Sequence, residues 1–182
     1  MLTKTEAMGY SIAEKKQQRL SPSMKACASW AALEEHDKVL DMACGSGALL
    51  NHLNQKMRLT LCGMCDSADQ ARVISEQLGG ADVIAARMED IPWRDDTFHA
   101  VLLPASMRGE PRKILEEALR VLHPGGQFVM AAPLFSLRGE GEISRKELLR
   151  LMQEVGFKDV SFRTAGLRGA AIGWKASLID LE

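Results

Sequence analysis

Hydrophobic and polar positions follow two patterns that alternate along most of the chain. Short apolar runs predict strands at 38–42, 59–64, 81–86, 98–103, 127–132, 160–163 and 170–178. Apolar residues three and four positions apart predict amphipathic helices at 22–35, from 46 onward, and at 67–79, 111–122 and 144–156. Strands that are apolar throughout are buried on both faces, so this alternation predicts a parallel sheet with helices on both sides.

Capping residues mark the ends of several predicted helices. Ser21 followed by Pro22 is a typical start, and capping boxes begin at Ser67 and Ser144. Gly156 is a typical helix end. The last two strands are joined by a short glycine-rich link, so we expect them to pair antiparallel. The fold class predicted from the pattern is therefore a doubly wound α/β sheet.

Length and charge limit the partners that we expect. At 182 residues, with 46% hydrophobic residues, residues 1–182 are most simply one domain. The segment 1–35 lies outside the alternation, and we expect it to be helical, as a lid or an added layer. The 23 basic and 24 acidic residues nearly cancel, so we expect no nucleic-acid or anionic-membrane partner. The oligomeric state stays open.

Apolar runs and cysteines point to a cytoplasmic protein. No run approaches the roughly 20 apolar residues of a membrane span, and the start lacks the apolar core of a signal peptide. Four cysteines are too few for a disulfide scaffold in a chain of this length. Cys62 and Cys65 form a C-x-x-C, but the second pair of a zinc site is missing. We therefore expect buried reduced thiols and no metal site.

A glycine loop follows the first predicted strand. In an open α/β sheet, ligands bind outside the carboxyl ends of the strands, where the winding reverses. The loop from Ala43 to Gly47 lies at that point, and Gly45 and Gly47 leave room for close approach of a ligand. Asp41 ends the strand, where its carboxylate can accept hydrogen bonds from the loop or from a ligand ammonium. Asp66, at the end of the second strand, supplies an acid for ribose hydroxyls.

The spacing of the glycines favours S-adenosylmethionine (SAM) over a nicotinamide dinucleotide. The dinucleotide fingerprint G-x-G-x-x-G has a third glycine, and Leu50 takes its place here. In that fingerprint, the helix N-terminus binds a pyrophosphate. SAM has no phosphate, so an acid before the glycines and no third glycine favour SAM.

Four segments in the same order resemble the motifs of one family, the class I SAM-dependent methyltransferases. They are Val39-Leu40-Asp41-Met42-Ala43-Cys44-Gly45-Ser46-Gly47, Met88-Glu89-Asp90-Ile91-Pro92-Trp93-Arg94-Asp95-Asp96-Thr97-Phe98, Glu117-Ala118-Leu119-Arg120-Val121-Leu122-His123-Pro124-Gly125-Gly126 and Val155-Gly156-Phe157. The closest resemblance is to the small-molecule subgroup that includes quinone-biosynthesis C-methyltransferases. It implies a Rossmann-like, seven-stranded, mostly parallel sheet with the last strand antiparallel. It also implies SAM as cofactor and S-adenosylhomocysteine as product.

The resemblance assigns cofactor contacts to particular positions. The methionine end of SAM would lie among Asp41, Met42, Ala43, Cys44, Gly45 and Gly47. Asp66 and Ser67 would lie at the ribose, Arg87 and Met88 at the adenine, and Leu103 and Pro104 near the methyl group. The family segment G-V-D-x-S aligns Cys65 with the acid, so either Cys65 or Asp66 occupies the ribose position. Arg87 stands where relatives often have an acid.

No residue is assigned as catalytic from the sequence. SAM carries the activated methyl group, so the protein has mainly to align the reactants and exclude water during an in-line displacement. A general base is needed only for an acceptor that must lose a proton. The loop after the fourth strand lacks the N/D-P-P-Y motif of many amino-group methyltransferases. Loop arginines would suit an anionic small molecule, although a solvated surface explains them as well; they are Arg87, Arg108, Arg138 and Arg145.

Two further functions stay open at this point. The first is a non-catalytic or degenerate SAM-binding module, because Arg87 and Cys65 depart from the family pattern. The second, weaker, is an NAD(P)-dependent oxidoreductase, against which the missing third glycine argues.

Overall fold

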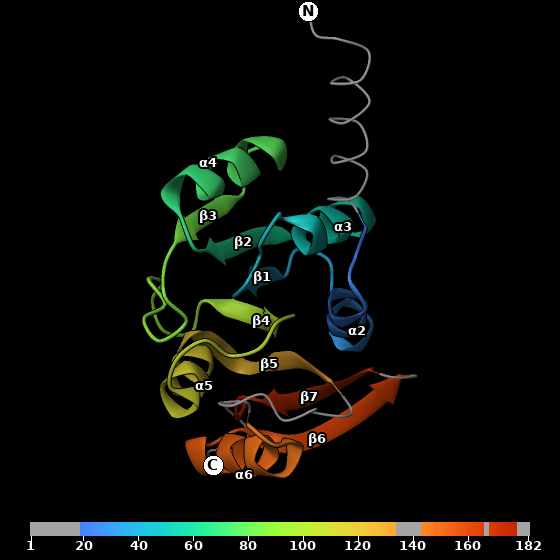
Figure 1. Cartoon of the computed structure of the whole chain (residues 1–182), viewed down its shortest axis with the longest axis vertical. Helices are drawn as coiled ribbons and strands as arrows, with labels where there is room; N and C mark the ends of the chain where they lie inside the picture. Colours follow the sequence, from blue (N-terminus) through green and yellow to red (C-terminus); the bar gives the residue numbers. More distant parts are fainter. Residues whose placement is uncertain (1–18, 134–142, 166–167, 178–182) are drawn as a thin grey trace, which may run out of the picture.

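A seven-stranded sheet forms the centre of the computed structural model, which describes residues 19–133, 143–165 and 168–177 (Figure 1). The strand order is β3-β2-β1-β4-β5-β7-β6. The strands are β1 (Lys38–Asp41), β2 (Thr60–Cys65), β3 (Asp82–Ala85), β4 (Phe98–Leu103), β5 (Leu122–Pro133), β6 (Lys158–Ala165) and β7 (Arg168–Trp174). The strands from β3 to β5 pair in parallel, and β7 is antiparallel to both neighbours. The predicted fold class is confirmed.

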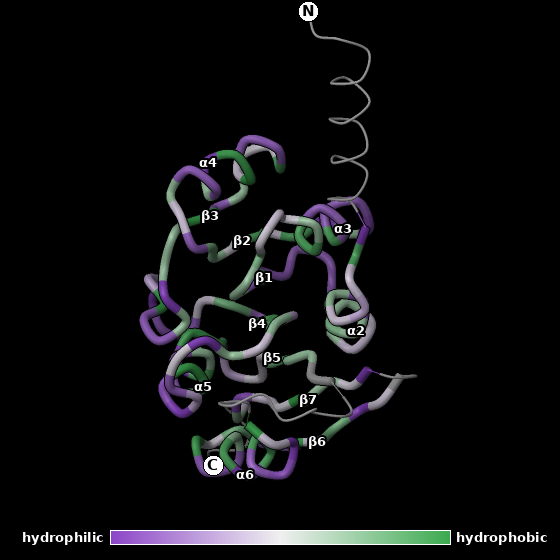
Figure 2. The backbone as a smooth tube through the Cα atoms, viewed as in Figure 1, coloured by the Kyte–Doolittle hydropathy of each residue, from purple (hydrophilic) through white to green (hydrophobic). Residues whose placement is uncertain are grey.

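Helices cover both faces of the sheet, as expected. On one face lie α2 (Pro22–Trp30), α3 (Ala48–Lys56) and α4 (Ala68–Gln77), and on the other α5 (Pro111–Val121) and α6 (Arg145–Val155). Neighbouring strand residues point to opposite faces: Val39 packs in the core with α2 and α3, and Leu40 in the core with α5. Figure 2 shows the hydrophobic positions along the strands and on the inner sides of the helices. Burial of both faces explains why the strands are apolar throughout.

Side-chain caps confirm several predicted helix starts. Ser21, Ser67 and Ser144 each accept a hydrogen bond of 3.2 Å from the backbone N–H three residues later. Gly156 ends α6 in the left-handed region, with φ +118°. These contacts satisfy backbone groups that have no partner inside the helix.

Several element boundaries differ from our expectation; the last strand, for example, ends at Trp174 rather than at 178. The first helix ends at Trp30 rather than near Glu35. The segment 123–126, which lies between the predicted helix 111–122 and the predicted strand 127–132, belongs to β5. Its glycine backbone pairs with Lys175, the residue after β7: Gly125 N–H donates to the Lys175 carbonyl at 3.1 Å, and Lys175 N–H donates to the Gly126 carbonyl at 2.9 Å. This backbone pairing to a residue distant in sequence could not be predicted locally.

The N-terminal part of the chain contributes a covering helix. α2 packs against β5 and β7, where Cys27 is fully buried. The expected lid covers residues 1–35, of which 1–18 lie outside the described residues. None of the described helices is long and apolar enough to cross a membrane.

Candidate cofactor-binding site

The loop after β1 is held at the point where the winding of the sheet reverses. β1 pairs in parallel with β2 on one side and β4 on the other. Met42 N–H donates to the carbonyl of Leu102 in β4, and Cys44 N–H to the carbonyl of Met64 in β2, both at 2.9 Å. Gly45 has φ +54°, a value that glycine adopts without strain. The loop is therefore fixed between the carboxyl ends of two strands.

Leu50 occupies the place of the missing third glycine, and the structure shows how the helix still approaches the sheet. A Cβ added to Gly63 in β2 would lie 2.9 Å from Leu50 Cδ1 and 3.1 Å from Cys44 Sγ. The glycine that permits this close approach therefore lies in the strand, at Gly63, rather than in the helix. Gly47 similarly permits close packing of α4, because a Cβ added to it would lie 2.8 Å from Ile74 Cγ2.

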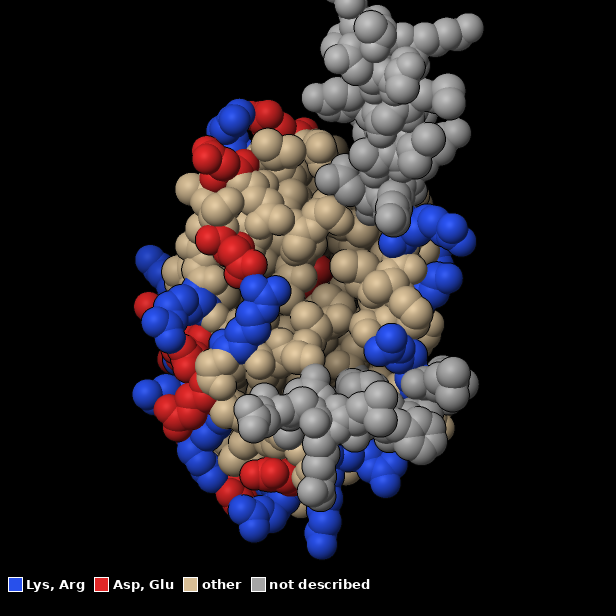
Figure 3. All heavy atoms as spheres, viewed as in Figure 1, with Lys and Arg blue, Asp and Glu red and all other residues tan. Residues whose placement is uncertain are grey.

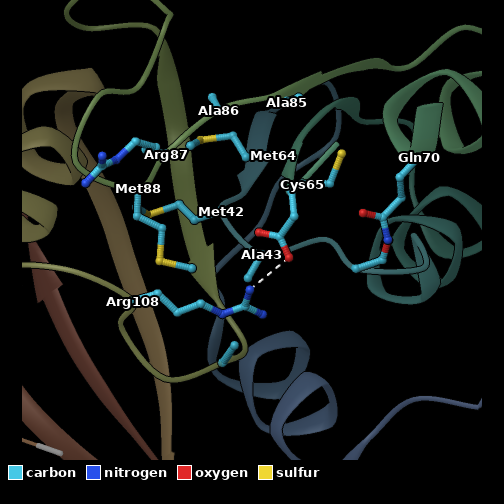
Figure 4. A pocket seen from close by; sticks show the side chains of 13 residues that line it. Met42, Ala43, Met64, Cys65, Gln70, Ala85, Ala86, Arg87, Met88 and Arg108 are labelled. Carbon is cyan, nitrogen blue, oxygen red and sulfur yellow. Dashed lines mark hydrogen bonds and ion pairs between the residues drawn. The ribbon is translucent and has the colours of Figure 1, made fainter. Parts of the chain in front are cut away.

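A cavity of about 420 Å³ opens beside this loop. That volume is in the range of small-ligand sites. Its lining consists of Met42, Ala43, Gly45, Met64, Cys65, Asp66, Gln70, Ala85, Ala86, Arg87, Met88, Ala105 and Arg108. Figure 3 shows basic and acidic side chains meeting beside a hollow in an otherwise uncharged part of this face. In Figure 4, the side chains of Met42, Met64 and Met88 lie together along one wall.

Asp41 is a buried carboxyl group at the end of β1, directly before the lining residues Met42 and Ala43. Its Oδ1 accepts a hydrogen bond of 3.0 Å from Ala43 N–H, and its Oδ2 has no partner among the described residues. Burial raises the pKa of Asp41 to about 7, although the bond from Ala43 acts in the opposite direction. Buried polar atoms are nearly always hydrogen-bonded, so the free Oδ2 indicates an absent partner.

Asp66 and Cys65, the two candidates for the ribose position, both line the cavity. The thiol of Cys65 is turned to the protein backbone and donates to the carbonyl of Ser67 at 3.3 Å. The carboxylate of Asp66 is exposed, and its Oδ2 lies 2.8 Å from Nη1 of Arg108. The acid available to a ligand at the end of β2 is therefore Asp66.

Arg87 lines the cavity, but its guanidinium points away from it toward Glu89, with which it forms an ion pair (Figure 4). Glu89 Oε1 also accepts a hydrogen bond of 2.6 Å from Glu110 N–H. This backbone bond and the Arg87 guanidinium lower the pKa of Glu89. Glu89 thus joins the loop before β4 to the loop after it.

The E-x-x-R segment, Glu117 to Arg120, forms hydrogen bonds with the same loop before β4. Glu117 accepts a hydrogen bond of 2.8 Å from Ile91 N–H. Arg120 donates to the carbonyls of Ile91 and Trp93 and to the carboxylate of Asp95, at 2.8–2.9 Å. The bond from Arg120 and the one from Ile91 lower the pKa of Glu117. The second and third of the four segments that resemble the family therefore form one contact network.

The structure brings together part of the predicted set. Of the twelve predicted cofactor residues, six line the cavity: Met42, Ala43, Gly45, Asp66, Arg87 and Met88. The other six do not line it: Asp41, Cys44, Leu103 and Pro104 are buried, Gly47 begins α3, and Ser67 caps α4.

Several lining residues were not predicted as cofactor contacts. Gln70 donates from Nε2 to the carbonyl of Gly45 at 2.7 Å and so supports the loop. Its sequence signal, the third helical position of a capping box, suggested only a helix start. Of the four loop arginines that would suit an anionic molecule, Arg108 and Arg87 line the cavity. Arg145 lies over the Phe162 ring at 5.2 Å, and Arg138 is outside the described residues.

The cavity, together with the buried Asp41 that directly precedes its lining residues, fits SAM. The free Oδ2 of Asp41 suits an ammonium group, and a Cβ on Gly45 would meet only the Ala43 carbonyl, at 3.8 Å, so the loop surface is open there. Three methionines and four alanines give the lining an apolar part that suits a ligand without phosphates.

Known proteins agree with this reading. A family model described as Methyltransferase domain matches residues 40–130, half of the chain. A demethylmenaquinone methyltransferase of Paenarthrobacter aurescens is 34% identical over 97 residues, which are 52% of this chain and 38% of that protein. The chain thus spans well under half the length of that relative.

Solved structures share the fold. The geranyl diphosphate C-methyltransferase of Streptomyces coelicolor, in complex with S-adenosylhomocysteine, has a TM-score of 0.72 at 13% identity, over 84% of this chain and 75% of that one. The [4+2]-cyclase SpnF has a TM-score of 0.70 at 16% identity, over 85% and 80%. Together with the family match, the glycine loop and the cavity beside it, these likenesses show that the chain belongs to the methyltransferase domain family of class I SAM-dependent methyltransferases.

Proposed function

We propose that the protein transfers the methyl group of SAM to a small-molecule acceptor. The buried Asp41 carries this proposal: it directly precedes the lining residues Met42 and Ala43, and its Oδ2 has no partner among the described residues. Asp41 would hold the ammonium group of SAM, and the loop at Gly45 its methionine part. Asp66 would hold the ribose and Met88 the adenine. Arg87 would contribute its backbone, because its side chain is engaged by Glu89.

The chemistry follows from what each partner supplies. When bound, SAM supplies a methyl group on a sulfonium, which is transferred in one in-line displacement. The apolar walls formed by Met42, Met64 and Met88 exclude water and align the reactants. The described residues that line the cavity include no histidine, so we propose alignment rather than general-base catalysis.

We propose further that the methyl acceptor is anionic. Arg108 reaches the cavity from the loop between β4 and α5, and its side chain is 66% exposed. An exposed guanidinium binds carboxylate and phosphate groups bidentately.

A second candidate is a SAM-binding protein that transfers no methyl group. It is favoured by Cys65 at the family's acid position and by the similar fold of SpnF, which is named as a cyclase. A shared fold does not fix the reaction.

Two measurements separate these candidates. Calorimetry with S-adenosylhomocysteine is expected to show binding, and its absence at millimolar ligand would refute both. Incubation of methyl-labelled SAM with a panel of carboxylates, phosphates, phenols and amines is expected to label at least one small acceptor. Binding without transfer to any acceptor would favour the second candidate. NADH in place of S-adenosylhomocysteine is the control for a dinucleotide site, and we expect it not to bind.

A further inference from the structure

An ion pair crosses the cavity at its exposed side. Asp66 follows β2, and Arg108 lies on the loop between β4 and α5, so the pair joins two separate walls. Arg108 Nη1 lies 2.8 Å from Asp66 Oδ2, and the two side chains are 66% and 77% exposed. In Figure 4, Arg108 extends across the space below Met42 and Met88 to this carboxylate.

The backbone next to Arg108 is anchored, whereas its side chain extends into the open. Glu89 accepts the N–H of Glu110 at 2.6 Å, two residues after Arg108. Gly109 has φ +128°, and an added Cβ there would lie 2.5 Å from Glu89 Oε1, so the loop fits closely against Glu89. The side chain of Arg108, which is exposed, can rotate away from Asp66 without moving this anchor.

The pair conflicts with the proposed use of Asp66. A ribose has two neighbouring hydroxyl donors, which match the two oxygens of one carboxylate. Arg108 already uses one of these oxygens, and its guanidinium lies across the cavity. A ligand whose two hydroxyls bond to both oxygens of Asp66 therefore competes with this side chain.

We propose that Arg108 is a latch that holds Asp66 across the cofactor cavity and releases it when a ribose binds. The latch rests on the proposed function, because it assigns the ribose to Asp66. It makes Arg108 a residue that opposes cofactor binding, although it lies in the cofactor site.

The size of the effect follows from the exposure of the pair. Exposed ion pairs of this kind change an equilibrium by about 1.5- to 5-fold. Removal of Arg108 should therefore tighten ligand binding by about that factor. Salt screens exposed charges and so weakens the ion pair. Added salt should therefore also tighten ligand binding to the wild-type protein.

The test is calorimetric titration of S-adenosylhomocysteine into wild type, Arg108→Met and a control, Arg72→Met. Arg72 has the same 66% exposure and pairs with Glu76 at 3.0 Å on α4, and neither residue lines the cavity. We expect Arg108→Met to bind about 1.5- to 5-fold more tightly than wild type, and Arg72→Met to bind as wild type does. Added sodium chloride should tighten binding to wild type and leave Arg108→Met unchanged.

A double-mutant cycle assigns the effect to the pair. Asp66→Asn should bind more weakly than wild type because it loses the charged acceptor, and Arg108→Met should add nothing in that background. Thermal melting of each variant checks folding. Equal or weaker binding by Arg108→Met than by wild type would overturn the latch while leaving the proposed function intact. Absence of binding by every protein, wild type included, would instead refute the proposed function, and the latch with it.

Discussion

Asp41 is the residue whose environment says most about the site. It is fully buried, one of its oxygens is bonded to Ala43 N–H, and the other has no partner among the described residues. The titratable groups that face it are the thiols of Cys27 from α2 and Cys44 from the loop. Burial and the nearby Asp41 raise the pKa of Cys27 to about 12, so it carries no charge near neutral pH. Among the described residues, burial and the bond from Ala43 are the influences on the pKa of Asp41, and no cation is one of them.

We expect binding of S-adenosylhomocysteine to depend on the protonation of Asp41. Its pKa of about 7 means that the group is largely protonated below that pH and ionised above it. An ammonium needs the ionised form, so affinity should rise between about pH 6 and about pH 8, with release of up to one proton on binding. Calorimetry in buffers of different ionisation enthalpy measures that proton.

The control for this prediction is Asp69→Asn, an exposed acid on α4. It should keep the pH dependence, whereas Asp41→Asn should remove it and weaken binding by about 10-fold or more. A pH dependence that survives in Asp41→Asn would assign the proton to another group.

The same carboxyl group also affects stability. Because its folded-state pKa is raised from 3.8 to about 7, its stabilising contribution is present below its unfolded pKa. That contribution is lost as the pH rises through about 7.

At the scale of elements, α5 is bonded to the loop between β3 and β4, which also contains the lining residues Arg87 and Met88. Arg120 binds two backbone carbonyls and two carboxylates, and its side chain is 31% exposed. The resemblance to the family's E-x-x-R segment thus has a structural reason: Glu117 and Arg120 fix the stretch from Ile91 to Asp95. This stretch in turn precedes β4.

Arg120→Met should lower the free energy of unfolding by about 2 kcal/mol, because several charge-assisted hydrogen bonds to partly buried groups are lost. Denaturant unfolding measures the change. Arg112→Met on the same helix is the matched control: Arg112 pairs with Glu154 at 2.7 Å and is 44% exposed, so its loss should cost well under about 1 kcal/mol. Equal losses for the two variants would contradict a special role of Arg120.

At the scale of the whole molecule, the site joins parts that are far apart in the sequence. The cavity takes residues from the loops and strand ends around β1, β2 and β3 and from the loop after β4. A ligand there contacts segments on both sides of the point where the winding reverses. Its binding should therefore stabilise the folded chain as a unit.

S-adenosylhomocysteine at 100 times its Kd should raise the stability by about 2.7 kcal/mol, and Tm by about 5–11 °C for a chain of this size. Thermal melting with and without the ligand measures this shift. NADH at the same concentration should leave Tm unchanged. A larger shift with NADH than with S-adenosylhomocysteine would point back to a dinucleotide site.

The local sequence determined much of the fold. Burial on both faces makes strands apolar throughout, and a serine cap or a glycine end is a local event, so the order of elements and several helix starts could be predicted. The position of the glycine loop was predictable for the same reason: a strand end, an acid and two glycines adjoin in the sequence.

Only the tertiary structure decided what depends on distant neighbours. The extension of β5 through 123–126 depends on Lys175, and the packing of Leu50 depends on Gly63. The partner of Asp66 is Arg108, 42 residues away. Side-chain pairing across loops is set by how the chain winds, because contact depends on position in space. The sequence therefore predicts the residues of the glycine loop, and the fold decides which side chains surround it and which charge pairs with Asp66.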